Sequence, residues 1–308
     1  MRQCIVAACL VLMSWSSIYG ADQRVAEIIK GLSAQSAREQ LHAATQAAEL
    51  GPLAVEAVPA LVRASKSTDL AVQHETIIAL GRIGPDASSA LPRLVELLSA
   101  ESIILKYSAC QSLRSMGSRS NNPAAIRALR RVASAGDSLV AVPAAWALVS
   151  MRPNDGKILE FALPILTAGL KSASSHVVAD AVGALGQIGR PAVSVVLDVM
   201  KSGNAPVICS CCDTLAGMGL DGEPAVGPLI AVTRTDDARA CRHAARALGM
   251  IGCLPKSSVP ALSRLLSHSD TGVRINAAQA LGAFSSESAS AVTDLVQALG
   301  SNDSHLKR

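Results

Sequence analysis

The feature that most constrains this chain is a two-helix module that recurs about every 33 residues. Its clearest copy runs from Asp69 to Leu97, DLAVQHETIIALGRIGPDASSALPRLVEL. Apolar side chains there are spaced three and four apart, as on one face of a helix. Gly84 ends the first helix, and Pro85 suits the opening of the second because its φ is already helical and it lacks an N–H. Neither helix can bury its stripe alone, so the module predicts stacking on further copies.

Other copies align when Leu80 is taken as a reference position. Equivalent positions are Ala47, Leu113, Leu148, Leu185, Leu215, Leu248 and Leu281. Eleven residues upstream, every copy carries a side chain that caps helix N-termini. These residues are Ser36, Asp69, Ser102, Asp137, Ser174, Asn204, Asp237 and Asp270. Two independent columns in one register predict stacked helical pairs. At Ser36, Glu39 three residues later also predicts a capping box.

Glycine and proline recur in the same register. Six copies place glycine four residues after the reference, which predicts left-handed C-terminal caps. They are Gly51, Gly84, Gly117, Gly189, Gly219 and Gly252. Glycine one residue after the reference suggests close backbone approach, at Gly81, Gly186, Gly249 and Gly282. Proline inside the other helix of a pair predicts bends, at Pro59, Pro92, Pro228 and Pro260.

These features together make the chain resemble the HEAT-repeat family, in the short form shared with phycobilin-lyase-like proteins. The shared features are the paired helices, the proline in the first helix, the aspartate that starts the second, and the pair Val273–Arg274. The resemblance implies an all-α fold, a right-handed α-solenoid (armadillo-like superhelix) of about eight helical pairs spanning residues 22–300. An aromatic content of only 2% agrees with thin layers of closely packed helices. The basic ladder of many HEAT proteins is missing, however, because only Lys106 and Arg274 occupy that column.

The ends of the chain carry separate expectations. Residues 1–20 have a basic start, a short apolar run and small polar residues, which predicts a signal peptide cleaved near Gly20 or Ala21 and therefore export. The apolar run is shorter than the ~20 residues that span a bilayer, so no transmembrane span is expected after its removal; an uncleaved anchor is the alternative. Residues 301–308 are expected to form a polar tail.

A surface for a partner is expected on the side of each second helix that faces away from the apolar stripe. In a curved solenoid this side lines the concave face, where extended partners bind. The candidate residues outside the seventh copy are His42, Glu75, Trp146 and Asp180. Trp146 is either a binding hot spot or a filler for the gap left by Pro143. The other side chains of these rows can equally form an ordinary solvated surface.

The seventh copy holds the best basic patch of the chain. Arg239, Arg242, His243 and Arg246 share one helical face and suit carboxylate, sulfate or phosphate groups. This patch is the basis for a second alternative function, the binding of anionic polymers. The opposing interpretation is a solvated face partly neutralised by Asp236 and Asp237. A formal net charge of +4 does not by itself indicate nucleic acid.

Six cysteines remain after the predicted signal, and the register assigns three of them to the core. Cys110, Cys211 and Cys212 fall where other copies place small apolar residues. A disulfide between Cys209 and Cys241 is disfavoured because stacked helices lie about 8–10 Å apart. The rival function is a cofactor-binding or metal-binding, lyase-like protein using the region from Cys209 to His243, with Cys209, Cys212, Cys241 and His243 as ligands. No HxxxH motif accompanies these residues.

Some HEAT-like families have catalytic roles. Deoxyhypusine hydroxylase-like proteins hold two irons with repeated His-Glu pairs, and this chain has only His74–Glu75. No phosphate-binding loop or nucleophile elbow is present. The prediction is therefore a non-catalytic protein-interaction scaffold, with no cofactor, no metal and no catalytic residue, that binds an unidentified protein or peptide.

Overall fold

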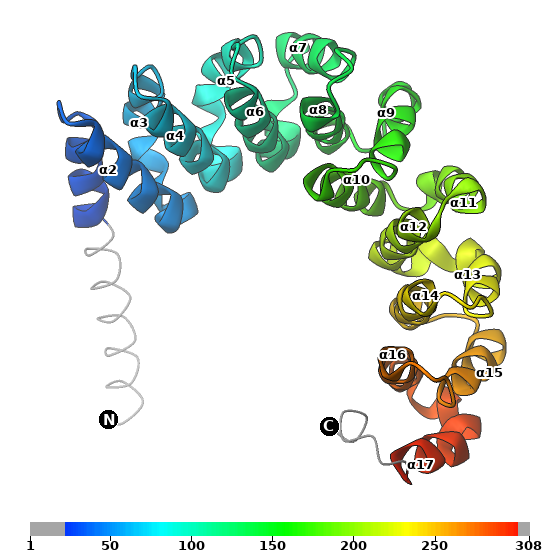
Figure 1. Cartoon of the computed structure of the whole chain (residues 1–308). Coiled ribbons are helices and arrows are strands. Elements are labelled where there is room, and N and C mark those ends of the chain that lie inside the picture. The colour runs from blue at the N-terminus through cyan, green and yellow to red at the C-terminus, as the bar shows by residue number, and fades with distance from the viewer. Residues whose placement is uncertain (1–21, 301–308) are drawn as a thin grey trace, which may run out of the picture. The chain divides into compact units, whose positions relative to one another are not determined.

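The computed structural model describes residues 22–300, and Figure 1 shows them as a succession of helices. The expected signal peptide (1–20) and polar tail (301–308) lie outside the described residues. Between residues 22 and 300 the chain forms α and 3-10 helices and no strand. The fold is an all-α solenoid of about eight helical pairs, as predicted.

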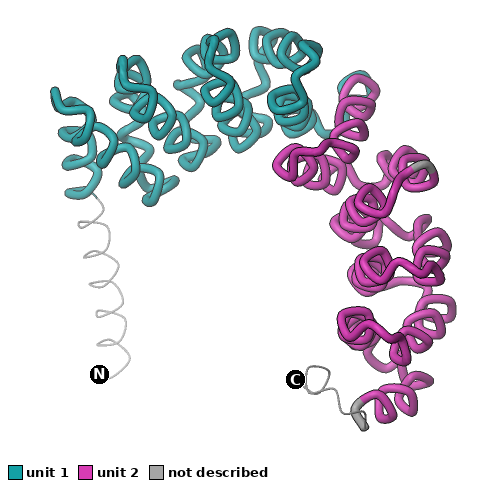
Figure 2. Tube along the Cα trace, in the orientation of Figure 1, with its two compact units in different colours: residues 1–158 teal, residues 159–308 magenta. Residues whose placement is uncertain are grey.

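The chain divides into two compact units, the first ending at Ile158 and the second beginning at Leu159, as Figure 2 shows in two colours. The boundary falls inside α9 (Gly156–Gly169). It follows the irregular corner around Arg152, which stands where other copies have glycine. The Arg152 guanidinium donates to Asn121 at 2.9 Å and so joins two corners of the first unit.

The first unit consists of two layers of helices. We call the helices that start at the predicted caps the capped layer. Helix 22–32 precedes the first cap. The capped layer contains α2 (Ala37–Leu50), α4 (Leu70–Ile83), α6 (Ile103–Met116) and α8 (Ser138–Met151), and each of these helices packs on the next. The second layer contains η1 (Gly51–Ala57) with α3 (Val58–Ala64), η2 (Gly84–Ala90) with α5 (Leu91–Leu97), and η3 (Gly117–Ser120) with α7 (Pro123–Ala133). Each α-helix of the second layer packs on the capped helix that follows it.

The second unit repeats this plan. Its capped layer contains α10 (Ser175–Ile188), α12 (Ala205–Gly217), α14 (Ala238–Ile251) and α16 (Thr271–Ala283), again packed in sequence. Its second layer contains η4 (Arg190–Ala192) with α11 (Val193–Ser202), η5 (Gly219–Ala225) with α13 (Val226–Val232), α15 (Pro255–Leu265), and η6 (Ser285–Ala291) with α17 (Val292–Gly300). Neighbouring elements therefore supply the core of each unit, as expected of a solenoid.

The register is confirmed at both columns. All eight reference residues, from Ala47 to Leu281, are 0% exposed. All eight predicted caps stand at the N-cap position of a capped-layer helix. Asp69 shows the mechanism, because its carboxylate accepts N–H bonds from Ala71 and Val72. Ser36 and Ser174 make no such side-chain bond. The capping box predicted at Ser36 is therefore wrong in that the serine hydroxyl accepts no backbone N–H bond.

The glycine caps are partly confirmed. All six glycines have positive φ, but the predicted left-handed helical conformation is wrong for several of them. Gly84, with φ 77° and ψ −137°, adopts a conformation that is accessible essentially to glycine alone. Gly252, with φ 60° and ψ 28°, lies in the left-handed helical region. Gly51, Gly84, Gly117 and Gly189 lie outside it. A 3-10 segment starts directly at Gly51, Gly84 and Gly117.

The proline column does not bend continuous helices as predicted. Pro59 and Pro92 lie in the first turn of α3 and α5, each directly after a 3-10 segment. A first-turn N–H has no acceptor within its helix, so proline loses no hydrogen bond there. The direction of the chain changes earlier, where Ala54 and Ala87 leave helical dihedral angles. Only Pro260 lies well inside its helix, α15.

Close backbone approach is confirmed at two of the four glycines in the second column. A Cβ atom at Gly81 would lie 3.0 Å from Cα of Ser112, and one at Gly249 would lie 2.7 Å from Cα of Ala280. At Gly186 the contacts would be ordinary, and at Gly282 the space is open. Glycine thus sets the spacing between α4 and α6 and between α14 and α16.

Within residues 22–300, no single helix is both long enough and apolar enough to cross a bilayer. The helices Ser175–Ile188 and Arg190–Lys201 make an angle of 119° with each other. Only together are they long enough and apolar enough for such a span.

Candidate functional site

The predicted basic patch lies on α14, which begins after the cap Asp237. Its four residues recur three, four and seven positions apart, so they share the face of α14 opposite the buried alanines. Arg239 and Arg246 are exposed, whereas Arg242 and His243 are partly buried. This face is where the capped layer meets solvent.

Asp213 on α12 is the central acceptor of this patch. Its Oδ1 lies 2.5 Å from Nδ1 of His243 and accepts a hydrogen bond from Nη2 of Arg246, also at 2.5 Å. A carboxylate oxygen only accepts, so Nδ1 of His243 is the donor. One carboxylate thus ties α14 to the preceding helix of the capped layer.

The Asp213 carboxyl group is held ionised by these two partners. Its burial acts to raise its pKa, but hydrogen bonds and positive charge from His243, followed by those from Arg246, outweigh that effect. The pKa of Asp213 therefore lies below its ordinary value of 3.8.

The stability of the second unit should depend on pH through Asp213. Because its pKa is lower in the folded chain than in the unfolded chain, its contribution is complete above pH 3.8 and is lost as pH falls through the folded value. Asp213→Asn should lower the free energy of unfolding by about 1 kcal/mol at pH 6, a modest effect because Arg246 is half exposed. The difference from wild type should shrink below the ordinary pKa. Urea unfolding monitored by circular dichroism across pH 3–6 measures it.

The matched control for this prediction is Asp86→Asn. Asp86 is exposed in η2 and makes no hydrogen bond or ion pair with another described residue. Its replacement should change the free energy of unfolding by less than about 0.5 kcal/mol. A deficit in Asp213→Asn that stayed constant down to pH 3 would contradict the assignment.

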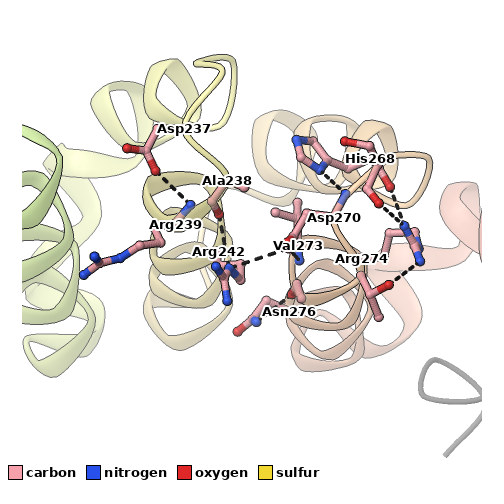
Figure 3. Close-up of polar contacts among 12 residues, drawn as sticks. Asp237, Ala238, Arg239, Arg242, His268, Asp270, Val273, Arg274 and Asn276 are labelled. Carbon is pink, nitrogen blue, oxygen red and sulfur yellow. Dashed lines mark hydrogen bonds and ion pairs between the residues drawn. The ribbon is translucent and has the colours of Figure 1, made fainter.

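Arg242 extends from the same face toward the following helix, as Figure 3 shows. Its Nε lies 3.3 Å from the carbonyl oxygen of Ala238 and 3.6 Å from Oδ1 of Asp270, the cap of α16. Its side chain also packs over Gly272, where a Cβ would lie 2.6 Å from Cδ of Arg242. The carboxylates that partly neutralise the patch are therefore Asp213 and Asp270 on the neighbouring helices, rather than Asp236 and Asp237.

The patch lines a cavity between α14 and α16. Its volume is about 340 Å³, and its lining consists of Arg239, Arg242, His243, Arg246 and Asn276. No carboxylate belongs to this lining, because Asp213 and Asp270 bind the cationic side chains from the sides. The arrangement is suited to holding an anionic group by charge-assisted hydrogen bonds.

The remaining predicted residues lie on other helices. His42 is exposed on α2, Glu75 is partly exposed on α4, and Asp180 is partly exposed on α10 of the second unit. The structure brings together only the four residues of α14.

Trp146 contacts the side chain of an arginine on the neighbouring helix. The guanidinium carbon of Arg114 on α6 lies 3.8 Å from the centroid of the Trp146 ring on α8. Such stacking is a cation–π interaction of about 0.5–2 kcal/mol. Pro143 is buried in the preceding turn of α8. Trp146 thus stabilises the packing of α6 on α8 while part of it stays exposed.

Five of the six described cysteines are buried, and Cys253 is partly exposed. All six described cysteines are free thiols, and Cys110, Cys211 and Cys212 are 0% exposed. Burial raises the pKa of Cys211 to about 12 and raises the pKa of Cys212, Cys209 and Cys241 as well. Burial therefore disfavours the thiolate form of these side chains. Within residues 22–300 no cluster of three or more His, Cys, Asp or Glu side chains has metal-binding geometry.

Sequence reasoning had not assigned Asp213 and Asp270 to the patch. The register indicates the contact of Asp213 with Arg246, because these two residues occupy the same position in successive copies. Side chains at equivalent positions of stacked helices are neighbours, so this pair was predictable. The contact of Arg242 with Asp270 depends on the offset between α14 and α16, which the register does not give.

The fold and this surface define a class of protein, the α-solenoids built from stacked helical pairs. A family model described as HEAT repeats matches residues 25–114 and 226–308, together more than half of the chain. The chain therefore belongs to the HEAT-repeat family. The unmatched middle contains the irregular corners, and no curated protein matches the chain.

Solved structures agree on the fold. A crystal structure of a Kap121p triple mutant is similar with a TM-score of 0.53 and 14% identity, covering 93% of this chain and 36% of that one. Kap121p bound to Ste12p is similar with a TM-score of 0.52, at the same identity and coverage. The chain thus spans about a third of the length of Kap121p, and the likeness shows the fold alone.

Proposed function

We propose that this chain is an exported, non-catalytic scaffold that binds a protein or peptide through the solvent-facing side of its capped layer. The observation that carries the proposal is the cavity on α14 and α16, which presents cationic side chains held in place by carboxylates of the neighbouring helices. Preformed charge of this kind favours a specific partner because little ordering is needed on binding. Membership of a family whose fold is typical of interaction scaffolds supports the same function.

The rival metal-binding function has no ligand set within residues 22–300, because no group of three or more His, Cys, Asp or Glu side chains there could hold a metal ion. Export is supported by the sequence of residues 1–20 alone.

The proposal is tested by affinity capture. The purified protein is immobilised, incubated with the exported fraction of its native source, and the captured proteins are identified by mass spectrometry. Replacing the five side chains His42, Glu75, Trp146, Asp180 and Arg246 together should reduce capture of a specific partner at least tenfold, because hot-spot side chains dominate binding.

The matched control carries replacements of exposed side chains outside the capped layer, namely Arg63, Arg131, Glu160 and Arg264. It should capture the partner as well as wild type does, with the helical signal of circular dichroism retained in both variants. Equal capture by wild type and the capped-layer variant would contradict the proposal.

A further inference from the structure

A second cavity continues the cationic one along the same two helices. It has a volume of about 240 Å³ and is lined by Arg246, Gly249, Met250, Asn276, Gln279, Ala280 and Ala283. The two cavities share Arg246 and Asn276, so they form one depression. We call the residues lining both cavities the α14–α16 groove.

The end of the groove nearest the start of α14 is cationic, and only some of its guanidinium N–H donors have an acceptor. Arg239 extends away from α16 in Figure 3, and its guanidinium makes no hydrogen bond or ion pair with any described residue. Arg242 uses only Nε toward Ala238 and Asp270, and Arg246 uses only Nη2 toward Asp213. Because each guanidinium carries five N–H donors, most donors at this end remain available to an anion.

The other end of the groove is largely apolar. Met250 is 55% exposed there, which is unusual for a large apolar side chain. The floor is built from Gly249 and Ala280, whose backbones approach too closely for a larger side chain. Because Gly249 and Ala280 carry no large side chain, the exposed Met250 beside them offers an apolar surface against which a side chain of a ligand can pack.

The spacing of the two ends sets the size of the ligand. Eleven residues separate Arg239 from Met250 along α14, which at ~1.5 Å per residue is about 16 Å. An extended peptide advances ~3.3 Å per residue, so about five residues cover this distance. A free anion such as phosphate would occupy only the cationic end.

We propose that the α14–α16 groove binds an extended acidic peptide segment, with carboxylates at Arg239 and Arg242 and an apolar side chain about five residues away against Met250. This inference rests on the proposed scaffold function and names the chemistry of its partner. Charge complementarity selects the acidic end, and the exposed methionine selects the apolar end.

The test uses fluorescein-labelled synthetic peptides and the purified protein, with binding followed by fluorescence anisotropy. Each peptide carries two adjacent glutamates and a leucine five residues away in an otherwise Gly-Ser chain, and both chain directions are made. At least one direction should bind, about tenfold more tightly than its Glu→Gln counterpart and about fivefold more tightly than its Leu→Ser counterpart. Arg239→Ser should weaken binding about tenfold and Met250→Ser about fivefold.

Matched control variants separate a local effect from a global one. Arg127→Ser removes an exposed arginine of α7, and Leu220→Ser removes a side chain of η5 that is 72% exposed. Both should leave peptide affinity unchanged. Arg239 is exposed and its guanidinium makes no hydrogen bond or ion pair with a described residue, so its replacement should keep the fold, which circular dichroism checks.

Three outcomes would overturn the inference. The first is failure of both peptides to bind, and the second is binding that does not depend on the leucine or on Met250. The third is binding of heparin or single-stranded RNA more tightly than the peptides, with a steep salt dependence that Met250→Ser leaves unchanged, which would assign the groove to anionic polymers. If the partner captured from the exported fraction is retained by Arg239→Ser and Met250→Ser but lost by the five-residue variant, the groove assignment fails and the scaffold function stands.

Discussion

Replacing Leu80 by alanine is expected to lower the free energy of unfolding by about 3 kcal/mol, the largest effect predicted for this chain. Leu80 is 0% exposed, in the middle of α4. Helices α2 and α6 pack on α4 from both sides, and α3 covers it from the second layer. The truncation leaves a cavity that rigid backbones on every side cannot fill, so both transfer energy and packing are lost.

Because each helix of a solenoid contacts only its neighbours, the damage should be local. Native-state hydrogen exchange should show faster exchange in α4, α2 and α6, with little change in α14 and α16. The matched control is Leu220→Ala, at a side chain that is 72% exposed, which should cost less than about 0.5 kcal/mol. Uniform loss of protection across both units after Leu80→Ala would contradict nearest-neighbour packing.

Gly249→Ala should lower the free energy of unfolding by about 2 kcal/mol. The new Cβ would lie 2.7 Å from both Cα and Cβ of Ala280, so α14 and α16 would have to separate. Backbone atoms cannot move aside as the end of a flexible side chain can, which makes this small substitution costly. Thermal and urea unfolding by circular dichroism measure the loss.

The same register position provides an opposite control. Gly282 on α16 has nothing within 4 Å of its would-be Cβ. Gly282→Ala should therefore stabilise the chain by about 0.5 kcal/mol, since alanine is the better helix former. Equal effects at the two glycines would show that helix propensity, rather than the spacing of α14 and α16, decides the outcome.

The repeat in the sequence predicted most of the fold. The column headed by Leu80 identified the core, and the column headed by Asp69 identified the helix starts, because burial and capping each require particular residue types at fixed spacing. The conformation after Gly84 was predicted less well. A positive φ follows from the glycine, but the 3-10 segment and its sharper turn depend on how η2 packs against α4 and α6.

The candidate site was predicted only in part. Helical spacing placed Arg239, Arg242, His243 and Arg246 on one face because that arrangement lies within a single helix. The partners of these side chains lie on α12 and α16, some 30 residues away in the chain. The sequence contained both carboxylates but not the distances that pair them.

The sequence by itself determined the class of fold, the starts of the capped-layer helices and the buried reference column, because these follow from local hydrogen bonding and from periodicity repeated many times. Only the tertiary structure decided which glycines are close contacts, which aspartates neutralise the patch, and where the groove opens on α14 and α16. Those properties depend on the offset between stacked helices, which packing sets to within an ångström and which no single helix encodes.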